Sequence, residues 1–234
     1  MQKQNKIFNT RSAFTLSEVL ITLALMGTLM ALTIPTLLQS TNKVAYVDGL
    51  KKTYGMLDSA TSQIMMNNAG TLIGAFTSSD AIVTKYCSVL DCLKICTAGT
   101  AASEGCYNEL SALKTLNDST MEDPADPNIS GFVLADGTLF ITKNTETIPG
   151  TCNDSFLGVA SICGFFNIDI NGFAGPNTFG RDIFSFDITK NGLIPSGTIG
   201  ARTNYATYCD PASSDASNGD GCSGRVLNEG AMNY

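Results

Sequence analysis

A single apolar segment near the N-terminus constrains this chain more than any other feature of its sequence. From Phe14 to Leu38, 16 of 25 residues are apolar, and Glu18 carries the only charge. As a helix rising about 1.5 Å per residue, the segment would be about 37 Å long, which exceeds the roughly 30 Å hydrocarbon core of a bilayer. The segment therefore predicts a membrane-spanning helix over residues 14–38.

The residues ahead of this segment predict its orientation. Residues 1–13 contain Lys3, Lys6 and Arg11 and no acidic residue. Because positive charges beside a membrane segment stay in the cytoplasm, the chain beyond Leu38 is expected outside the cytoplasm. One alternative is a secretory signal peptide, but its apolar region spans only about 7–15 residues and ends at a small-x-small cleavage site. The other alternative is a plain signal anchor, and neither one accounts for Glu18.

Glu18 is unusual because it is an acidic residue within an apolar segment. An ionised carboxylate inside a bilayer costs about 3 kcal/mol or more unless it is paired, so such a residue predicts a functional partner. The simplest alternative is that Glu18 reaches the lipid headgroups close to the start of its own helix.

The residues around Glu18 resemble the leader junction of type IV prepilins and type II secretion pseudopilins. The resemblance covers Arg11 to Ile21, with the sequence RSAFTLSEVLI. In that family a membrane-embedded aspartyl peptidase removes the leader on the cytoplasmic face and methylates the new N-terminus. The resemblance implies that residues 1–13 are a leader peptide, cleaved between Ala13 and Phe14, and that Phe14 is methylated. Ala13 departs from the family pattern, in which glycine is usual at this position.

The same resemblance points to two helix-loosening positions, Gly27 and Pro35, where family members often carry helix-breaking residues. Pro35 lacks an N–H group and crowds the preceding turn, so we expect it to kink the helix without ending it. Nearby threonines are expected to bond back to carbonyls one turn earlier: Thr22, Thr28 and Thr33. The alternatives for residues 27–35 are a static kink and partial unwinding in an assembled state.

The resemblance also implies a function, that of a structural subunit and not an enzyme. The chain would be a pilin or pseudopilin in a type IV pilus-like or type II secretion filament. Its partners would be the prepilin peptidase/methyltransferase, other pilin or pseudopilin subunits, an inner-membrane assembly platform and the lipid bilayer. It would cross the bacterial inner membrane once, with its head outside the cytoplasm. In the filament, Glu18 of one subunit would neutralise the amine that cleavage frees at Phe14 of another, which fixes their register.

Composition excludes several other functions. The chain has no histidine, which removes Ser-His-Asp and Cys-His nucleophile systems and His-ligated zinc sites. Its net charge is −7, and it becomes −10 when the three leader cations are removed, so a nucleic-acid partner is not expected. The alternative function is a membrane-anchored extracytoplasmic binding protein or enzyme, for which a Ser–Lys pair remains compatible with the sequence.

Beyond Leu38, apolar residues recur at helical spacing. The stripe consists of Val47, Leu50, Tyr54, Leu57 and Ile64. It predicts one helix from Phe14 to about Met66, whose amphipathic half, residues 39–66, packs on an extracytoplasmic head formed by residues 67–234. The sequence Asn67-Asn68-Ala69-Gly70 is typical of a helix C-terminus.

Strand patterns occur mainly in the second half of the chain. The expected strands are residues 131–135, 138–142, 165–170, 182–188 and 193–194. Asp136-Gly137, between the first two of these strands, is a strong hairpin signature. In residues 165–170 and 182–188, apolar and polar side chains alternate, which predicts half-buried strands. With a short helix expected near residues 106–116, the pattern predicts an α+β fold in which four or five antiparallel strands pack on the helix stripe. The pilin resemblance implies the same fold.

Eight cysteines follow the membrane segment. They are Cys87, Cys92, Cys96, Cys106, Cys152, Cys163, Cys209 and Cys222. Outside the cytoplasm thiols meet oxidising conditions, which favours disulfides. Closeness in sequence favours Cys152–Cys163, Cys209–Cys222 and two disulfides within Cys87–Cys106. A zinc site of four thiolates is the alternative, although the sequence lacks a paired C-x2-C signature.

One loop has the residue pattern of a cation site. Residues 167–172, with the sequence NIDING, match the alternating oxygen ligands and glycine of the first half of a calcium loop. The acidic twelfth position is absent, because Thr178 occupies it. Residues 169–182 also resemble loops in pilin-like heads, some of which bind calcium, and this resemblance makes Asp169, Asn171 and Asp182 the candidate ligands. The prediction is therefore that residues 169–182 form an Asx- and Gly-rich turn and that the chain binds no cofactor. The alternative is that this loop binds calcium.

Overall fold

The structure is a computed structural model of the whole chain. It describes residues 14–109, 112–120, 127–144, 150, 152, 154–156 and 159–234, without the side chains of residues 35–40, 154–156, 159 and 160. The predicted leader, including Ala13, lies outside the described residues. The chain divides into two units, Met1–Asn42 and Lys43–Tyr234, and each is described by itself. We refer to Lys43–Tyr234 as the globular unit.

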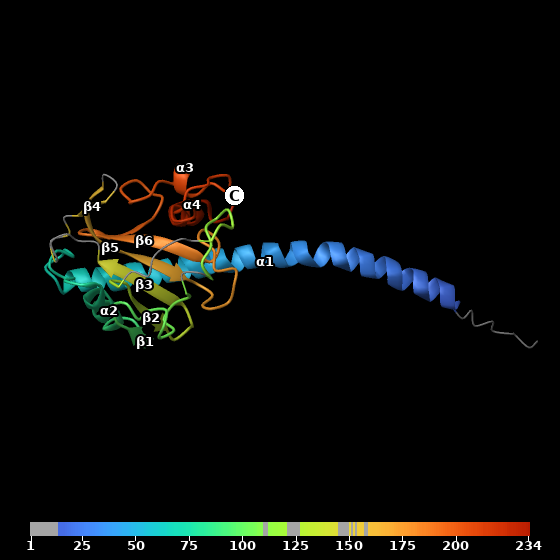
Figure 1. Cartoon of the computed structure of the whole chain (residues 1–234), viewed down its shortest axis with the longest axis horizontal. Coiled ribbons are helices and arrows are strands. Elements are labelled where there is room, and N and C mark those ends of the chain that lie inside the picture. Colours follow the sequence, from blue (N-terminus) through green and yellow to red (C-terminus); the bar gives the residue numbers. More distant parts are fainter. Residues whose placement is uncertain are drawn as a thin grey trace, which may run out of the picture. The chain divides into compact units, whose positions relative to one another are not determined.

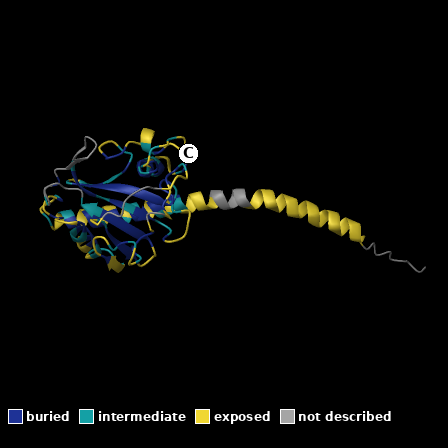
Figure 2. Ribbon diagram, in the orientation of Figure 1, coloured by how far each residue is buried: buried dark blue, intermediate teal, exposed yellow. Residues whose placement is uncertain are grey.

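Helix α1 (Leu16–Met66) begins in the first unit with the segment predicted to span a membrane. In the described part of the chain, Leu16–Ile34 is the helical segment long and apolar enough to cross a bilayer, a test that a signal sequence also passes. Every residue of this segment is exposed, as Figure 2 shows. The apolar N-terminal helix expected from the sequence is therefore present.

Helix α1 continues through Pro35 without ending. The three threonines named for this role bond back to the helix as expected: Thr22 Oγ1 donates to Val19 O at 2.9 Å, Thr28 Oγ1 to Leu25 O at 2.9 Å, and Thr33 Oγ1 to Leu29 O at 3.0 Å. A bilayer would offer these hydroxyl groups no water, and the bonds satisfy them within the helix. A kink or unwinding at residues 27–35 stays a prediction.

In the globular unit, the second half of α1 is amphipathic. Val47, Leu50, Leu57 and Ile64 are buried, and Tyr54 is half-buried with its ring stacked on Phe186 at a centroid distance of 5.7 Å. The helix ends where the sequence predicts. Ala69 and Gly70 adopt left-handed backbone conformations, and Gly70 N donates to Met65 O at 2.8 Å.

The globular unit contains one antiparallel sheet of seven described strands (Figure 1). In spatial order its strands are β1 (Cys92–Cys96), β2 (Ser130–Leu134), β3 (Leu139–Asn144), β5 (Val159–Asp169), β6 (Ile183–Thr189) and β7 (Gly192–Pro195), with β4 (Asp154–Phe156) also paired to β5. This confirms the mixed α+β architecture. The sequence missed β1 and β4, which are short.

The β2–β3 hairpin forms at the predicted turn. Gly137 has a φ of 88°, which favours glycine, and Asp136 Oδ1 accepts hydrogen bonds from the N–H and hydroxyl groups of Thr138. Lys52 of α1 forms an ion pair with Asp136 at 2.7 Å. The hairpin is therefore tied to the helix as well as to the sheet.

Helices pack on one face of the sheet and loops pack on the other. Helix α1 and helix α2 (Ser79–Cys87) share an apolar core with one face, which includes Phe132, Phe140 and Phe166. Inside this core the ring of Phe166 meets those of Tyr86, Phe132 and Phe140 edge-on. The opposite face, with Leu139 and Ile141, packs against Tyr107, Leu113 and Phe179 from the loops. We call the second side the loop face.

Among the described residues of the range 106–116, where a short helix is expected, none is α-helical, and Ala112 has 3-10 helical conformation. Cys106 is joined to β1 by the Cys96–Cys106 disulfide, and Lys114 forms isolated bridges with Thr120 and Thr178. These contacts join both ends of this range to other parts of the globular unit. Short helices instead occur at α2, α3 (Tyr205–Tyr208) and α4 (Cys222–Glu229), and α4 contacts β6.

All eight cysteines form disulfides between positions close in sequence. The pairs are Cys87–Cys92, Cys96–Cys106, Cys152–Cys163 and Cys209–Cys222. The second two match the predicted pairs, and the first two are the pair of bridges expected within Cys87–Cys106. No thiolate is left for the alternative zinc site.

Removal of the Cys209–Cys222 disulfide is expected to cost more stability than removal of Cys87–Cys92. The two pairs are separated by 13 and 5 residues, and a longer closed loop constrains the unfolded chain more strongly. Replacing both cysteines with alanine should lower the free energy of unfolding by about 3 kcal/mol for the first pair and about 2 kcal/mol for the second. Guanidinium unfolding without reductant measures both values. The reverse order would contradict the loop-length argument.

Candidate functional site

The start of α1 holds Glu18 by a reciprocal set of hydrogen bonds. Thr15 N and Thr15 Oγ1 each donate to Glu18 Oε2 at 2.8 Å, and Glu18 N donates to Thr15 Oγ1 at 3.3 Å. This is a capping box, in which the N-cap residue and the residue three positions later satisfy N–H groups that the first turn leaves open. Glu18 therefore has a partner within its own chain.

That partner was not predicted, although the sequence carries its signal. A threonine followed three residues later by glutamate, just ahead of an apolar run, is the capping-box pattern. The expected cleavage site lies directly before this box, and Phe14 is 86% exposed. Cleavage there would place a free amine one residue ahead of the N-cap Thr15.

The surface that follows the capping box is apolar over its described length. The strongly exposed large side chains between residues 14 and 34 are Phe14, Leu16, Val19, Leu20, Ile21, Leu23, Leu25, Met26, Leu29, Met30, Leu32 and Ile34. A contiguous apolar surface of this extent marks a membrane or protein contact. In this part of the chain, Glu18 is the acidic residue on that surface.

A second cluster lies on the loop face, between β5 and β6. Asp169 is the last residue of β5, where it is paired with Leu139 and Ile183, and Asp182 immediately precedes β6. Because paired residues share a sheet face, the pairing places Asp169 with the residues of the loop-face core. Both aspartate side chains belong to residues that are 0% exposed.

Each of these carboxylates accepts hydrogen bonds from N–H groups. Asn108 Nδ2 donates to Asp169 Oδ2 at 2.8 Å, and Asn171 N donates to Asp169 Oδ1 at 3.3 Å. Asp182 is held by its own loop, because Asn177 N and Thr178 N donate to its two oxygens at 2.8 and 2.7 Å. The structure therefore gathers Asp169, Asn171 and Asp182, the three candidate ligands, in one loop.

The two carboxylates repel each other in a dry environment. Burial, together with the neighbouring Asp182, raises the pKa of Asp169 to about 8. Burial also raises the pKa of Asp182, which hydrogen bonds from Thr178, Asn177 and the Asn171 side chain partly offset. Burial and both carboxylates raise the pKa of the Tyr107 phenol. A second like charge in such a place disfavours ionisation of the first unless a cation balances both.

The globular unit also contains a buried ion pair. Arg202 Nε lies 2.5 Å from Asp187 Oδ1, Arg202 N donates to Asp187 Oδ2 at 2.6 Å, and the guanidinium lies over the ring of Phe165. Asp220, which accepts from Ser185 Oγ at 2.7 Å, has its pKa raised by burial and lowered by Arg202. These contacts could not be predicted from the sequence, because their partners lie 15 and 35 residues apart.

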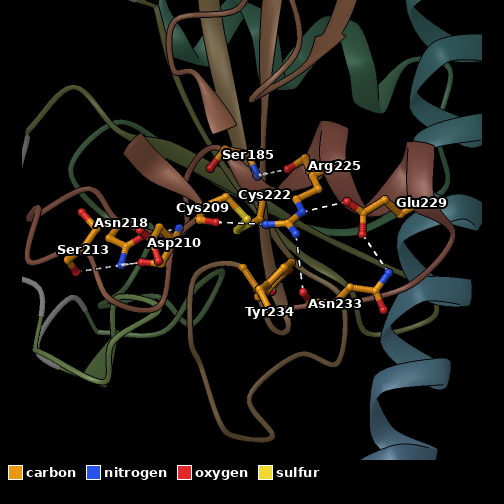
Figure 3. Close-up of a disulfide and its surroundings, with 12 residues drawn as sticks. Ser185, Cys209, Asp210, Ser213, Asn218, Cys222, Arg225, Glu229, Asn233 and Tyr234 are labelled. Carbon is orange, nitrogen blue, oxygen red and sulfur yellow. Dashed lines mark hydrogen bonds and ion pairs between the residues drawn. A yellow bond between two sulfur atoms is a disulfide. The ribbon is translucent and has the colours of Figure 1, made fainter. Parts of the chain in front are cut away.

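Figure 3 shows how the Cys209–Cys222 disulfide is embedded in the C-terminal segment. Arg225 of α4 donates to Glu229 Oε1 at 2.8 Å and to the carbonyls of Cys209 and Asn233, and its guanidinium lies 5.4 Å from the centre of the Tyr234 ring. These interactions join both ends of the disulfide to the last residues. Their role is structural.

No family model, no curated protein and no solved structure matches this chain. In the described part of the chain, no group of three or more Cys, Asp or Glu side chains could hold a metal ion. Functional assignment therefore rests on two features of the chain itself. They are the capped apolar helix and the pair of buried carboxylates on the loop face.

Proposed function

We propose that this chain is a structural subunit, a pilin or pseudopilin, of a type IV pilus-like or type II secretion filament. The observation that carries the proposal is Glu18, an acidic residue in the otherwise uncharged, exposed apolar segment that begins α1. It would be the fifth residue of the chain that cleavage after Ala13 would leave. A membrane anchor needs length and apolarity but no carboxylate. A helix that also recognises another subunit has a use for one.

The capping box explains how such a subunit tolerates Glu18 before assembly. In the stored form, the carboxylate satisfies N–H groups at the start of its own helix through Thr15. During assembly, Glu18 moves to the methylated amine of Phe14 on a neighbouring subunit. The exchange replaces hydrogen bonds from neutral donors with an ion pair to a cationic donor, and the Coulomb attraction between two opposite charges is stronger in a dry environment.

The exposed apolar surface of Leu16–Ile34 would also exchange one partner for another during assembly. Lipid covers Leu16–Ile34 in the inner membrane, and helices of other subunits cover it in the filament core. The prepilin peptidase/methyltransferase and the inner-membrane assembly platform act between these two states. The four disulfides support a location outside the cytoplasm for the globular unit, because oxidising conditions maintain them there.

The intact mass and N-terminal sequence of the protein purified from bacterial membranes test this proposal. We expect a chain that begins at Phe14, carries one additional methyl group and lacks eight hydrogens because of its four disulfides. Ala13→Gly, which restores the residue usual in the family, should be processed at least as fully. Ala13→Leu places a large side chain at the cleavage site and should retain the leader. Material that keeps Met1 in cells with an active prepilin peptidase would contradict the proposal.

A further inference from the structure

The loop between β5 and β6 exposes an apolar surface at its tip. Phe173 is 57% exposed, whereas the phenylalanines of the two apolar cores are at most 2% exposed. The next three residues, Ala174, Gly175 and Pro176, are exposed as well, and no residue from 170 to 180 is charged. We call residues 173–176 the apolar tip. In a chain with 21 acidic residues, an uncharged tip with an exposed aromatic ring indicates contact with an apolar partner.

Hydrogen bonds fix the shape of the apolar tip. Asn171 Nδ2 donates to Gly175 O at 3.2 Å, and Thr178 Oγ1 donates to Pro176 O at 3.1 Å. A segment that is already held in one shape loses little conformational entropy when it meets a partner. The loop therefore presents Phe173 to a partner without a further ordering step.

The loop lies beside the part of α1 with which the globular unit begins. A methyl group built at Gly49 of α1 would lie 3.3 Å from Ile170 Cδ1, so the helix and the base of the loop are in contact. Burial raises the pKa of the Tyr46 phenol, and Asp182 and Asp169, at the two ends of the loop, raise it further. The globular unit begins three residues before Tyr46. The apolar tip therefore belongs to the end of this unit that is closest in the chain to the predicted membrane segment.

The length of the chain keeps this end of the globular unit close to the bilayer. Five residues lead from Leu38, where the predicted membrane segment ends, to Lys43, and even a fully extended chain spans at most roughly 18 Å over them. We propose that the apolar tip inserts into the surface of the bilayer that α1 spans, with the Phe173 ring at the boundary between headgroups and acyl chains. Exposed apolar side chains of membrane-bound proteins bury themselves at that boundary.

Lipid is the partner that the chain itself brings to the apolar tip. Every copy anchored by α1 holds this end of its globular unit near a bilayer, whether or not a second copy is present. A second contact with the bilayer would limit how far the globular unit tilts on its single helix. The inference rests on the membrane location in the proposed function, but it depends on neither leader processing nor filament assembly.

Tryptophan fluorescence tests the contact, because the chain has no tryptophan of its own. Full-length Phe173→Trp is placed, one copy per disc, in nanodiscs of ordinary phosphatidylcholine or of phosphatidylcholine with brominated acyl chains, which quench tryptophan on contact. Leu25→Trp serves as the reference for lipid. Met66→Trp serves as the reference for water, because Met66 is 80% exposed at the other end of α1, about 35 Å along the helix from Lys43. Phe173→Trp should lose at least half as large a fraction of its fluorescence as Leu25→Trp, and Met66→Trp should lose none.

The references separate failure of this inference from failure of the proposed function. If Leu25→Trp is quenched but Phe173→Trp behaves like Met66→Trp, the apolar tip does not reach the bilayer and the inference is overturned, while the membrane helix stands. If none of the three is quenched, α1 does not enter the bilayer, which contradicts the inference and the proposed membrane location together. If Phe173→Trp emission shifts to shorter wavelength only in discs that hold several copies, the tip contacts a second copy, which also overturns the inference.

A charged variant shows whether the contact is apolar. Ala174→Asp, added to Phe173→Trp, places a carboxylate at an exposed position of the tip, so the fold should be unchanged, with the same Tm in detergent. Because an ionised carboxylate is costly to bring into lipid, the loss of fluorescence in brominated discs should fall by about threefold or more. An undiminished loss, at an unchanged Tm, would contradict insertion of the tip.

Discussion

Replacement of Arg202 with methionine is expected to lower the free energy of unfolding of the globular unit by about 3–5 kcal/mol. The side chains of Arg202 and Asp187 are 7% and 0% exposed, and methionine would leave the Asp187 carboxylate buried without its cation. Asp187 would keep one bond, from the backbone N–H of residue 202. The substitution also weakens the environment of Asp220, whose charge Arg202 stabilises. Guanidinium unfolding followed by circular dichroism measures the change.

A double substitution separates the charge from the packing. Asp187→Asn combined with Arg202→Met removes both charges, so it should recover a large part of the stability that Arg202→Met loses. The matched control is Arg181→Met, because Arg181 forms an ion pair with Asp118 that is 41% and 57% exposed. Loss of an exposed pair should cost less than about 1 kcal/mol. If Arg202→Met also lowers the free energy of unfolding by less than about 1 kcal/mol, the buried pair stabilises the globular unit no more than a surface pair does.

Features that depend on neighbouring residues could be predicted from the sequence. The end of α1 at Met66 follows from an apolar stripe that stops ahead of Ala69 and Gly70, which adopt the left-handed conformation. The β2–β3 hairpin follows from Asp136-Gly137, whose turn geometry needs those residue types. The disulfides could be paired because each one closes a short loop.

Features that depend on distant residues could not be predicted. Strand β1 has only five residues, and its partner in the sheet is the distant strand β2, which pairs with it from Leu134 at Cys92 to Gly131 at Cys96. Near residues 106–116, where the sequence predicts a short helix, Lys114 pairs with the distant Thr178, a contact that no local pattern records. The Arg202–Asp187 ion pair could not be predicted for the same reason, because it joins residues that are not neighbours in the sequence.

The candidate cation loop, residues 169–182, could be predicted from the sequence only in part. Its alternating oxygen ligands are visible in residues 167–172, and the sequence resemblance brings in Asp182. Asn177 and Tyr107 could not be identified from the sequence, because their side-chain oxygens are buried without a hydrogen-bond partner among the described residues only in the folded arrangement. Local spacing therefore predicts the position of the loop, and its buried oxygen atoms are defined only by packing.

Replacement of Glu18 with glutamine is expected to reduce incorporation into filaments by more than about tenfold, which corresponds to loss of about 1.4 kcal/mol or more of subunit pairing. Glutamine is also used at this position of a capping box, so the start of α1 should keep its hydrogen bonds from Thr15. What the substitution removes is the negative charge offered to the Phe14 amine of a neighbour. Immunoblots of sheared filaments and of inner membranes measure incorporation and insertion separately.

Glu18→Ala should show the same loss of incorporation with normal membrane insertion, because both variants lack the charge. The matched control is Thr15→Ala, which removes the N-cap hydroxyl and keeps Glu18. If pairing between subunits is what Glu18 provides, Thr15→Ala should assemble far better than either Glu18 variant. Equal loss in Thr15→Ala and Glu18→Ala, with normal assembly of Glu18→Gln, would instead show that Glu18 acts only as a helix cap. Normal assembly of all three variants would remove Glu18 from the assembly mechanism, because neither its charge nor its cap would then be needed.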